Sequence, residues 1–189
     1  MTRSVFDAAL MQNVMSGRHP LDHNSVCDAV TLPTSMGDIR GLKIAFSIDL
    51  GHYEVLDDVR RETINTLNAL GDAGAEITEV NIEWASEAIR LAHASEEFLF
   101  ENVIRQALAD CPEQLSDYVP QLYETASAVT ADDYRNALQV AGVVWTEHMG
   151  PLFQEYDILI TPGVSCPEVP AENWQKDKVL VNGKELTDT

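Results

Sequence analysis

Apolar and polar residues alternate along two short segments of the chain, and this pattern predicts two strands. Residues 42–48 place a large apolar side chain at every second position, and residues 75–82 alternate in the same way. Successive side chains of a strand point to opposite faces, so we expect the large apolar residues of the first segment to share one face of a sheet. These residues are Leu42, Ile44, Phe46 and Ile48.

Helical periodicity, with apolar residues three and four positions apart, occupies most of the remaining chain. It predicts a helix over residues 56–73, between the two strands. A strand–helix–strand unit of this kind almost always forms a parallel pair, which favours an α/β layer. Farther along, the same periodicity predicts helices over 85–109, 113–127 and 130–156.

Cap and turn residues indicate where several of these elements end. Thr130 followed by Asp133 is typical of a capping box at the start of a helix. Gly74 follows the 56–73 helix and can adopt the left-handed conformation that ends helices. Asn182-Gly183 lies inside an alternating run, which predicts a hairpin with a tight type I′ turn over residues 178–186.

The first 17 residues predict a capped amphipathic helix. Thr2 or Ser4 can accept from backbone N–H groups of the first turn, and Gly17 can end the helix. The apolar stripe comprises Val5, Ala8, Ala9, Leu10, Met11 and Met15. By itself this stripe indicates a helix packed on a core.

Residues 157–162 form a nearly continuous apolar run that ends in Thr161-Pro162. Such a run predicts a strand that is buried on both faces and has neighbours on both sides. In α/β folds, ligands usually bind where buried strands end. We therefore expect any substrate pocket to have an edge at Thr161, Pro162 and Gly163.

Composition limits the classes of function. The chain has 189 residues, of which 45% are hydrophobic, and this predicts one core-bearing domain over 1–189. Twelve basic and 31 acidic residues give a net charge of −19, which would repel nucleic acid and anionic lipid, and no basic patch offsets it. We expect neither nucleic acid nor membrane as a partner, and we expect the acidic surplus to serve solubility.

The cysteines indicate a reducing compartment. Cys27, Cys111 and Cys166 are widely spaced and form no CxxC pair, so neither a disulfide framework nor a zinc knuckle is predicted. No leader peptide is recognisable, and the apolar runs are too short to span a membrane. These features predict a cytoplasmic protein.

A metal site is the first of several chemical alternatives. His19, Asp22 and His23 combine ligand types that bind metals on helices, but Pro20 lies between them and disrupts the helical register. A polar turn in which Asp22 or Asn24 bonds to its own backbone explains the segment better. We expect no metal and no cofactor.

Other reactive side chains are also explained by ordinary structure. Lys43 lies on the non-apolar face of its predicted strand, which favours a solvated lysine over a catalytic base. Cys166 and His148 fall on opposite sides of a predicted strand, and nothing nearby supplies an oxyanion hole. Three aromatic residues are expected to fill a core or groove. They are Tyr134, Trp145 and Trp174.

Four segments, taken in order, resemble the amidase signature family. They are Met1 to Leu10, Gly41-Leu42-Lys43-Ile44-Ala45, Leu70 to Ile77 with its Gly74-Ala75-Glu76, and Asp157-Ile158-Leu159-Ile160-Thr161-Pro162. The resemblance covers nearly the whole chain and implies part of an α/β/α sandwich with a mixed sheet. Within one domain it implies a helix over 1–17, strand–helix–strand over 42–82, a helical cap over 84–156, and a strand and hairpin over 157–189.

The resemblance also implies what the chain does not carry. Members of the family hydrolyse or transfer amides with a Ser-Ser-Lys triad, located in a Lys-Pro-Thr-like segment and a Gly/Ser-rich stretch. Neither motif occurs in this sequence, so the resemblance implies an internal to C-terminal fragment without catalytic residues and inactive by itself. Ala141 and Gly163 also replace an arginine and a threonine that are frequent in the family.

A second class of function remains open beside the amidase fragment. A sheet taken from a larger one has exposed edges that favour strand addition or dimerisation. The chain could then be a noncatalytic interaction module or a split subunit. Its partner would be a second copy or the missing amidase portion, whereas the parent enzyme would act on a small-molecule amide.

Overall fold

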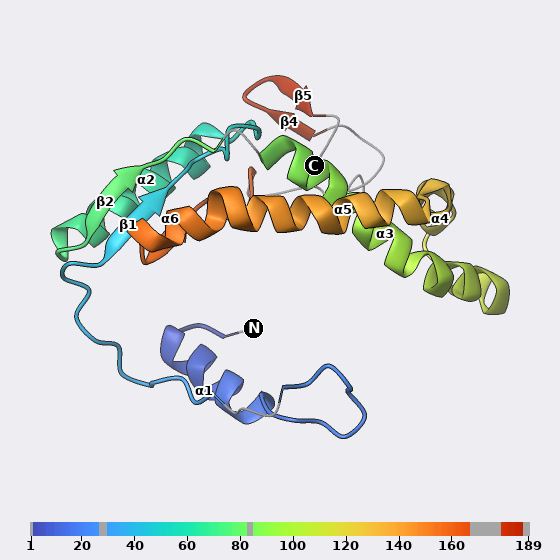
Figure 1. Cartoon of the computed structure of the whole chain (residues 1–189), viewed down its shortest axis with the longest axis horizontal. Coiled ribbons are helices and arrows are strands. Elements are labelled where there is room, and N and C mark those ends of the chain that lie inside the picture. Colours follow the sequence, from blue (N-terminus) through green and yellow to red (C-terminus); the bar gives the residue numbers. More distant parts are fainter. Residues whose placement is uncertain (1, 27–29, 83–84, 167–178, 187–189) are drawn as a thin grey trace. The chain divides into compact units, whose positions relative to one another are not determined.

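The computed structural model describes residues 2–26, 30–82, 85–166 and 179–186, and the chain divides into two compact units (Figure 1). The first unit spans Met1–Ile39 and the second spans Arg40–Thr189. The expectation of one domain over 1–189 stays a prediction.

The first unit contains one helix, α1 (Val5–Met15). Of the two predicted capping residues, Ser4 performs the role, because its Oγ accepts from the backbone N–H of Asp7 at 3.1 Å. The loop that follows α1 is bonded back to the helix at Asn13. The side-chain amide of Asn13 donates to the carbonyl of Leu32 at 2.9 Å, and its oxygen accepts from the N–H of Leu32 at 2.7 Å.

The prediction that the apolar stripe of α1 packs on a core is wrong for the described part of this unit. Ala9 is the one buried residue of the helix, whereas Val5 and Met15 are 66% and 69% exposed. The described residues that follow α1 in the unit form turns and extended connections and provide no second helix or sheet. The stripe therefore has no apolar layer to pack against within the unit.

The second unit is built on a parallel sheet whose strand order is β2-β1-β3. Its strands are β1 (Lys43–Phe46), β2 (Glu76–Glu79) and β3 (Ile158–Ile160). Helix α2 (Asp57–Asp72) connects β1 to β2 and packs beside them (Figure 1). This arrangement confirms the predicted α/β class and the strand–helix–strand unit.

The central strand places its large apolar residues on one face, as predicted, and the small residues on its other face are buried as well. Ile44 and Ile48 are 2% and 5% exposed, but Ala45 and Ser47 between them are also buried, at 0% and 4%. Small side chains can be covered closely by a second layer, which large apolar residues alone do not reveal. Alternation of large and small residues is therefore compatible with a central strand.

The structure differs from the prediction for residues 157–162. The structure places β3 at an outer position of the described sheet, paired with β1, and Ile158 is 39% exposed. A short apolar run shows that a segment prefers burial, but it does not show how many neighbours the sheet provides. The prediction of full burial on both faces is wrong in the described structure.

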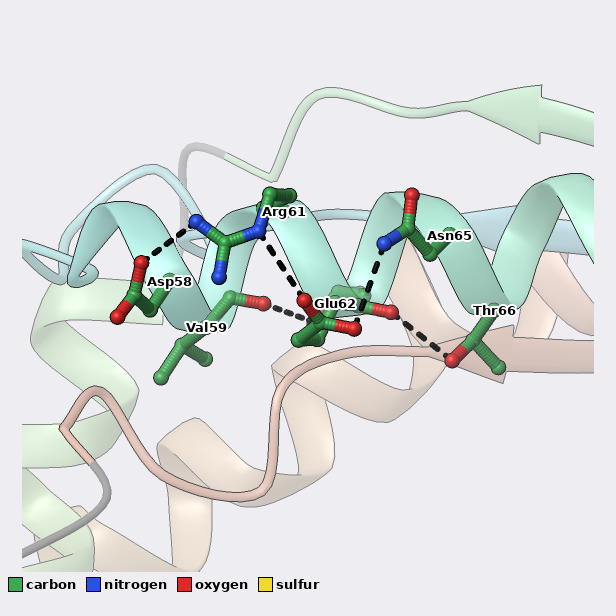
Figure 2. A network of polar contacts seen from close by, with 7 residues as sticks. Asp58, Val59, Arg61, Glu62, Asn65 and Thr66 are labelled. Carbon is green, nitrogen blue, oxygen red and sulfur yellow. Dashed lines mark hydrogen bonds and ion pairs between the residues drawn. The ribbon is translucent and has the colours of Figure 1, made fainter.

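The outer side of α2 carries a network of polar contacts (Figure 2). Arg61 Nη1 lies 2.6 Å from Asp58 Oδ1, and Arg61 Nε lies 3.1 Å from Glu62 Oε1. Asn65 donates to the second oxygen of Glu62 at 3.3 Å. The hydrogen bond to Asp58, with that to Glu62, raises the pKa of Arg61. These side chains are exposed, so the network covers a solvated helix face.

A helical excursion separates β2 from β3. Its elements are α3 (Ala85–Asp110), η1 (Pro112–Gln114), α4 (Val119–Ala128), α5 (Ala131–Val143), η2 (Val144–Met149) and α6 (Gly150–Glu155). Helix α3 packs against α4 and α5, and α5, η2 and α6 follow one another as a continuous rod (Figure 1). Within the described residues, no helix combines the length and apolarity needed to cross a membrane.

The predicted capping box at the start of α5 is confirmed. Thr130 Oγ1 accepts from the backbone N–H of Asp133 at 3.2 Å, and Asp133 Oδ2 accepts from the N–H of Thr130 at 2.9 Å. The hydrogen bond from the Thr130 hydroxyl, followed by that from its backbone, lowers the pKa of Asp133. The cap therefore stabilises the ionised carboxylate.

The rod contains a π-helical segment, η2, which the sequence pattern did not predict. Pro151 has no N–H to donate to Glu147, and the N–H of Gly150 bonds to Trp145, five residues earlier. A Cβ on Gly150 would lie 2.9 Å from the carbonyl oxygen of Trp145. Proline and glycine together thus account for the wider turn.

The predicted hairpin is present as β4 (Val179–Val181) and β5 (Lys184–Leu186), which pair antiparallel. Asn182 and Gly183 have φ angles of 51° and 77°, as a type I′ turn requires. Val181, next to the turn, is fully buried. The hairpin is therefore anchored to its unit by its turn end.

Candidate functional site

A cavity of about 460 Å³ lies beyond the carboxyl ends of β1 and β3. Its volume falls in the range of small-molecule sites. The residues that line it come from two loops, one after each strand. They are Ile48, Asp49, Leu50, Tyr53 and Val55 from the first loop, and Thr161, Pro162, Gly163, Val164, Ser165 and Cys166 from the second.

The sheet explains why these two loops meet. Because β1 and β3 are adjacent and parallel, their carboxyl ends lie at the same edge. The pairing continues one step beyond β1, where the N–H of Ser47 donates to Ile160 at 3.1 Å. Thr161, Pro162 and Gly163 then form one wall of the cavity. Their location agrees with the expected pocket edge, and their role in binding a substrate stays a prediction.

The start of the opposite wall is a turn centred on Asp49. Its Oδ1 accepts from the N–H of Gly51 at 2.8 Å, and its carbonyl accepts from Tyr53 at 2.8 Å. Leu50 adopts a φ of 52°, which is uncommon for a leucine. Asp49 Oδ2 also lies 4.0 Å from Arg60 Nη2 on α2. The turn thus fixes a carboxylate at the cavity wall.

Residues 54–56, at the end of this wall, bond to two other parts of the chain. The N–H of Leu56 donates to Ser165 in the other wall at 2.9 Å. Glu54 contacts the hairpin, and hydrogen bonds from Lys184 and then Asn182 hold the pKa of Glu54 below its usual value. The side chain of Val55, between these ties, is buried.

The cavity combines apolar walls with several polar groups. The polar groups are the Asp49 carboxylate, the Tyr53 phenol, the Thr161 and Ser165 hydroxyls, and the Cys166 thiol. Among the described residues that line the cavity, none is a lysine or histidine. The lining can hold a small molecule of mixed polarity, but it lacks the basic side chains that most often activate a hydroxyl or thiol nucleophile.

The structure does not bring Cys166 and His148 together in one site. Cys166 lines the first cavity, whereas His148 lines a second one of about 570 Å³ formed by η2, α6 and residues after β2. Lys43 is exposed, as expected for a solvated lysine. Its backbone N–H donates to Asp157 Oδ2 at 2.9 Å, so the aspartate of the apolar run ties the starts of β1 and β3.

The segment around His19 forms the expected polar turn. Asp22 Oδ1 accepts from the N–H of Asn24 at 2.9 Å, and His19 Nδ1 accepts from Leu21 at 3.3 Å. Across the parts of the chain that the structure describes, no three His, Cys, Asp or Glu side chains are grouped to hold a metal ion.

The three singled-out aromatic residues have different environments. Tyr134 stacks on Phe98, with ring centroids 4.9 Å apart, as expected for a packed aromatic. Trp145 on η2 is 58% exposed, so it does not fill a core, and its assignment to a groove stays a prediction. Trp174 lies outside the described residues.

Sequence reasoning missed the cavity wall formed by residues 48–55. It gave no role in a site to the turn at Asp49, to Tyr53 or to Val55. The signal was available in part, because this turn also follows a strand, and ligands bind at strand ends. What the sequence could not provide was the adjacency of β1 and β3, which are separated by the helical excursion.

Comparison with known proteins gives a consistent family assignment. A family model described as amidase matches residues 1–187. An acylamidase of Rhodococcus erythropolis is 28% identical over 183 residues, an alignment that covers 92% of this chain and 37% of the relative. The chain thus spans less than two fifths of the length of this relative.

Solved structures share the fold. A bacterial aryl acylamidase of the amidase signature enzymes superposes with a TM-score of 0.78 at 18% identity, over 98% of this chain and 40% of that structure. A chain from a vestigial protein complex, described as revealing the origins of an s-triazine catabolic enzyme, has a TM-score of 0.72 at 21% identity. That match covers 97% of this chain and 39% of the other.

Proposed function

Because the chain belongs to the amidase signature family, we propose that it forms one side of the substrate site of an enzyme that hydrolyses a carboxamide C–N bond. The observation that carries this proposal is the cavity at the ends of β1 and β3, whose wall includes Thr161, Pro162 and Gly163. A substrate of matching chemistry is a small amide with an apolar acyl group, since the wall has the hydroxyls of Thr161 and Ser165 at either end of Pro162, Gly163 and Val164.

The proposal assigns binding to this chain and catalysis to residues outside the sequence. The 189 residues contain no Gly/Ser-rich stretch and no serine three positions before a lysine. The described lining also contributes no lysine to the cavity. We therefore expect the chain by itself to bind amides weakly and to turn none of them over.

Ammonia release tests the catalytic half of the proposal. The purified chain is incubated with simple aliphatic and aromatic amides, and ammonia is measured against a buffer blank. We expect no release above the blank. Turnover that survives repurification and disappears after a single substitution in this chain would overturn the assignment of catalysis elsewhere.

Chemical-shift mapping tests the binding half. Benzamide and butyramide are titrated into the ¹⁵N-labelled chain, and shifts are expected at Thr161, Gly163 and Tyr53. A Cβ on Gly163 meets no atom within 4 Å, so Gly163→Phe places a ring in open space at the cavity wall and should abolish these shifts. Gly37 in the first unit is equally open, and Gly37→Phe is the matched control that should leave them unchanged.

A second candidate function is association through the edge of the sheet. The two outer strands differ, because exposed Glu76 and Glu79 flank β2 whereas Ile158 leaves an apolar side chain exposed on β3. Charged residues at an edge oppose strand addition, so β3 is the favoured edge for pairing with a second copy.

Light scattering coupled to size exclusion tests this second function. We expect a dimer whose population rises with concentration, and we expect Ile158→Lys to convert it to a monomer. Glu79→Lys on β2, the other outer strand, is the control and should leave the dimer unchanged. A wild-type chain that stays monomeric at high concentration would count against association, without bearing on amide binding.

A further inference from the structure

The hairpin β4–β5 contacts the cavity wall through its turn. Asn182 lies in the turn, and its side-chain amide reaches three groups near the start of α2. Nδ2 donates to the carbonyl of Val55 at 3.0 Å and lies 3.4 Å from Glu54 Oε1, while Oδ1 accepts from the N–H of Asp57 at 3.3 Å. One side chain therefore joins the end of the loop to the first residue of the helix.

This contact supplies a helix cap from a distant segment. The first N–H groups of an α-helix have no partner within the helix, and the N-cap residue of α2, Leu56, makes no side-chain cap bond. Asn182, 125 residues farther along the chain, accepts from Asp57 in place of a local cap. The start of α2 thus depends on the hairpin.

An ion pair forms a second tie beside the first. Lys184 Nζ lies 2.7 Å from Glu54 Oε2, and the Glu54 side chain is 29% exposed. The Glu54 carboxylate thus receives Lys184 on one oxygen and Asn182 on the other. Val181, next to the turn, is fully buried, so the hairpin itself is firmly seated.

The segment held by these contacts belongs to the cavity wall formed by residues 48–55. Tyr53 and Val55 flank Glu54 in sequence and line the cavity, and Leu56 bonds to Ser165 in the wall formed by residues 161–166. No strand pairing holds residues 50–56 in the described structure. The position of this wall therefore depends on a few side-chain and backbone hydrogen bonds, several of which come from the hairpin.

We propose that the hairpin is a clamp that sets the shape of the cavity, with Asn182 as a positioning residue that holds the backbone at Val55 and Asp57 and Lys184 as one that acts through Glu54. The clamp holds Tyr53 and Val55 in the wall and keeps the loop from opening. The inference rests on the proposed function in treating the cavity as a ligand site, but the contacts that carry it do not depend on the ligand.

Cys166 provides a probe of the wall that is independent of amide binding. Its thiol lines the cavity and is half-buried, so its alkylation rate reports how often the wall opens. The reporter is the full chain carrying Cys27→Ser and Cys111→Ser, alkylated with iodoacetamide. A second reporter keeps only Cys111, which follows α3 and bonds to the carbonyl of Ala107 in that helix.

Asn182→Asp is the test variant, because Asp-Gly also forms type I′ turns while the amide donor is lost and a like charge faces Glu54. We expect Cys166 to react about tenfold faster, in line with losing several hydrogen bonds to the loop, and Cys111 to react at an unchanged rate. Equal acceleration of both thiols would mean general loosening and would overturn the clamp. An unchanged Cys166 rate would overturn it as well.

A double-mutant cycle tests whether Lys184 acts through Glu54. Lys184→Met should accelerate Cys166 alkylation by about threefold, as expected for a weak exposed ion pair. In a Glu54→Gln background the same substitution should add nothing, since the charge it pairs with is gone. Additive effects would contradict the pairing. If the thiol rates follow the clamp and no amide binds, the proposed function fails while the clamp stands.

Discussion

The sheet around β1 and the helical excursion from α3 to α6 belong to the same unit, but side-chain hydrogen bonds of different range stabilise them. Around the sheet, Lys43 on β1 bonds to Asp157 across 114 residues, and Asp57 on α2 bonds to Asn182 across 125. In the excursion, the bonds of Thr130 with Asp133 and of Gln106 with Asp110 join residues three or four positions apart.

This difference in range determines how many elements a single substitution affects. A change in the sheet alters contacts with segments that are far away in sequence, so it affects several elements together. A change to a helix cap of the excursion alters hydrogen bonds between neighbouring residues and should remain local. Substitutions matched in chemistry and placed in the two regions can therefore test the contrast.

The largest expected effect comes from the centre of the sheet. Ile44 is 2% exposed, and Ile44→Ala should lower the free energy of unfolding by about 2–5 kcal/mol, because it leaves a cavity between strand and helices. Urea denaturation followed by circular dichroism measures the change. Lys43→Ala, at the exposed neighbouring position, is the control and should cost little. A cost below about 1 kcal/mol for Ile44→Ala would contradict a packed central strand.

The next effect is expected where α2 ends. Gly74 has a φ of 100°, and the N–H of Ala75 bonds back to Leu70, which forms a Schellman-type end. A Cβ at Gly74 would lie 2.4 Å from Arg40 Cγ, so Gly74→Ala should cost about 1–3 kcal/mol in the same denaturation experiment. Gly71→Ala, inside the helix, should instead stabilise by about 0.5–1 kcal/mol. If Gly74→Ala and Gly71→Ala changed the free energy of unfolding by similar amounts, the positive φ at Gly74 would not require a glycine.

A smaller and local effect is expected in the excursion. Thr130→Ala removes the capping box of α5 and should cost about 1 kcal/mol at neutral pH. The pKa of Asp133 is lowered in the folded chain, so the contribution of the pair is complete above the ordinary carboxyl range and is lost as the pH falls through the lowered value. The stability difference between wild type and variant, measured from pH 7 to pH 2, should therefore narrow below about pH 3.8, the unperturbed value, and the part due to the backbone cap bond should remain. Curves that stay parallel would contradict a role for the Asp133 carboxylate.

The smallest effect is expected on the outer face of α2. Arg61 contacts Asp58 and Glu62 in the network of Figure 2, but all three side chains are exposed. Solvent and salt screen such pairs, so Arg61→Gln should change stability by no more than the error of the denaturation experiment. A loss that disappears in 1 M salt would show that the network contributes more than exposed pairs normally do.

The same contrast of range explains which parts of the fold could be predicted from the sequence. Helix starts and turns depend on neighbouring residues, so Thr130, Ser4 and Asn182-Gly183 could be interpreted correctly. Strand order depends on contacts across the helical excursion, so the outer position of β3 in the described sheet could not be predicted from its apolar run. The apolar stripe of α1 was misjudged for a related reason, since a stripe does not show what covers it.

The candidate site shows the same limit. Thr161 to Gly163 could be placed at a cavity because they follow a strand, which is a local property. Asp49, Tyr53 and Val55 could be placed there only with knowledge that β1 neighbours β3. Asn182 and Lys184 carried no signal toward the cavity beyond their turn, because their contacts with Glu54 are purely tertiary.

The π-helical segment η2 has a consequence for the register of the rod. A wide turn contains one residue more than an α-turn, and each added residue advances the facing direction by about 100°. Positions on α5 and α6 that are counted four by four across residues 144–149 therefore do not share a face. Deleting one residue between Trp145 and Gly150 should therefore restore counting by fours and leave the facing of α6 nearly unchanged, because the wide turn holds its extra residue within about one revolution.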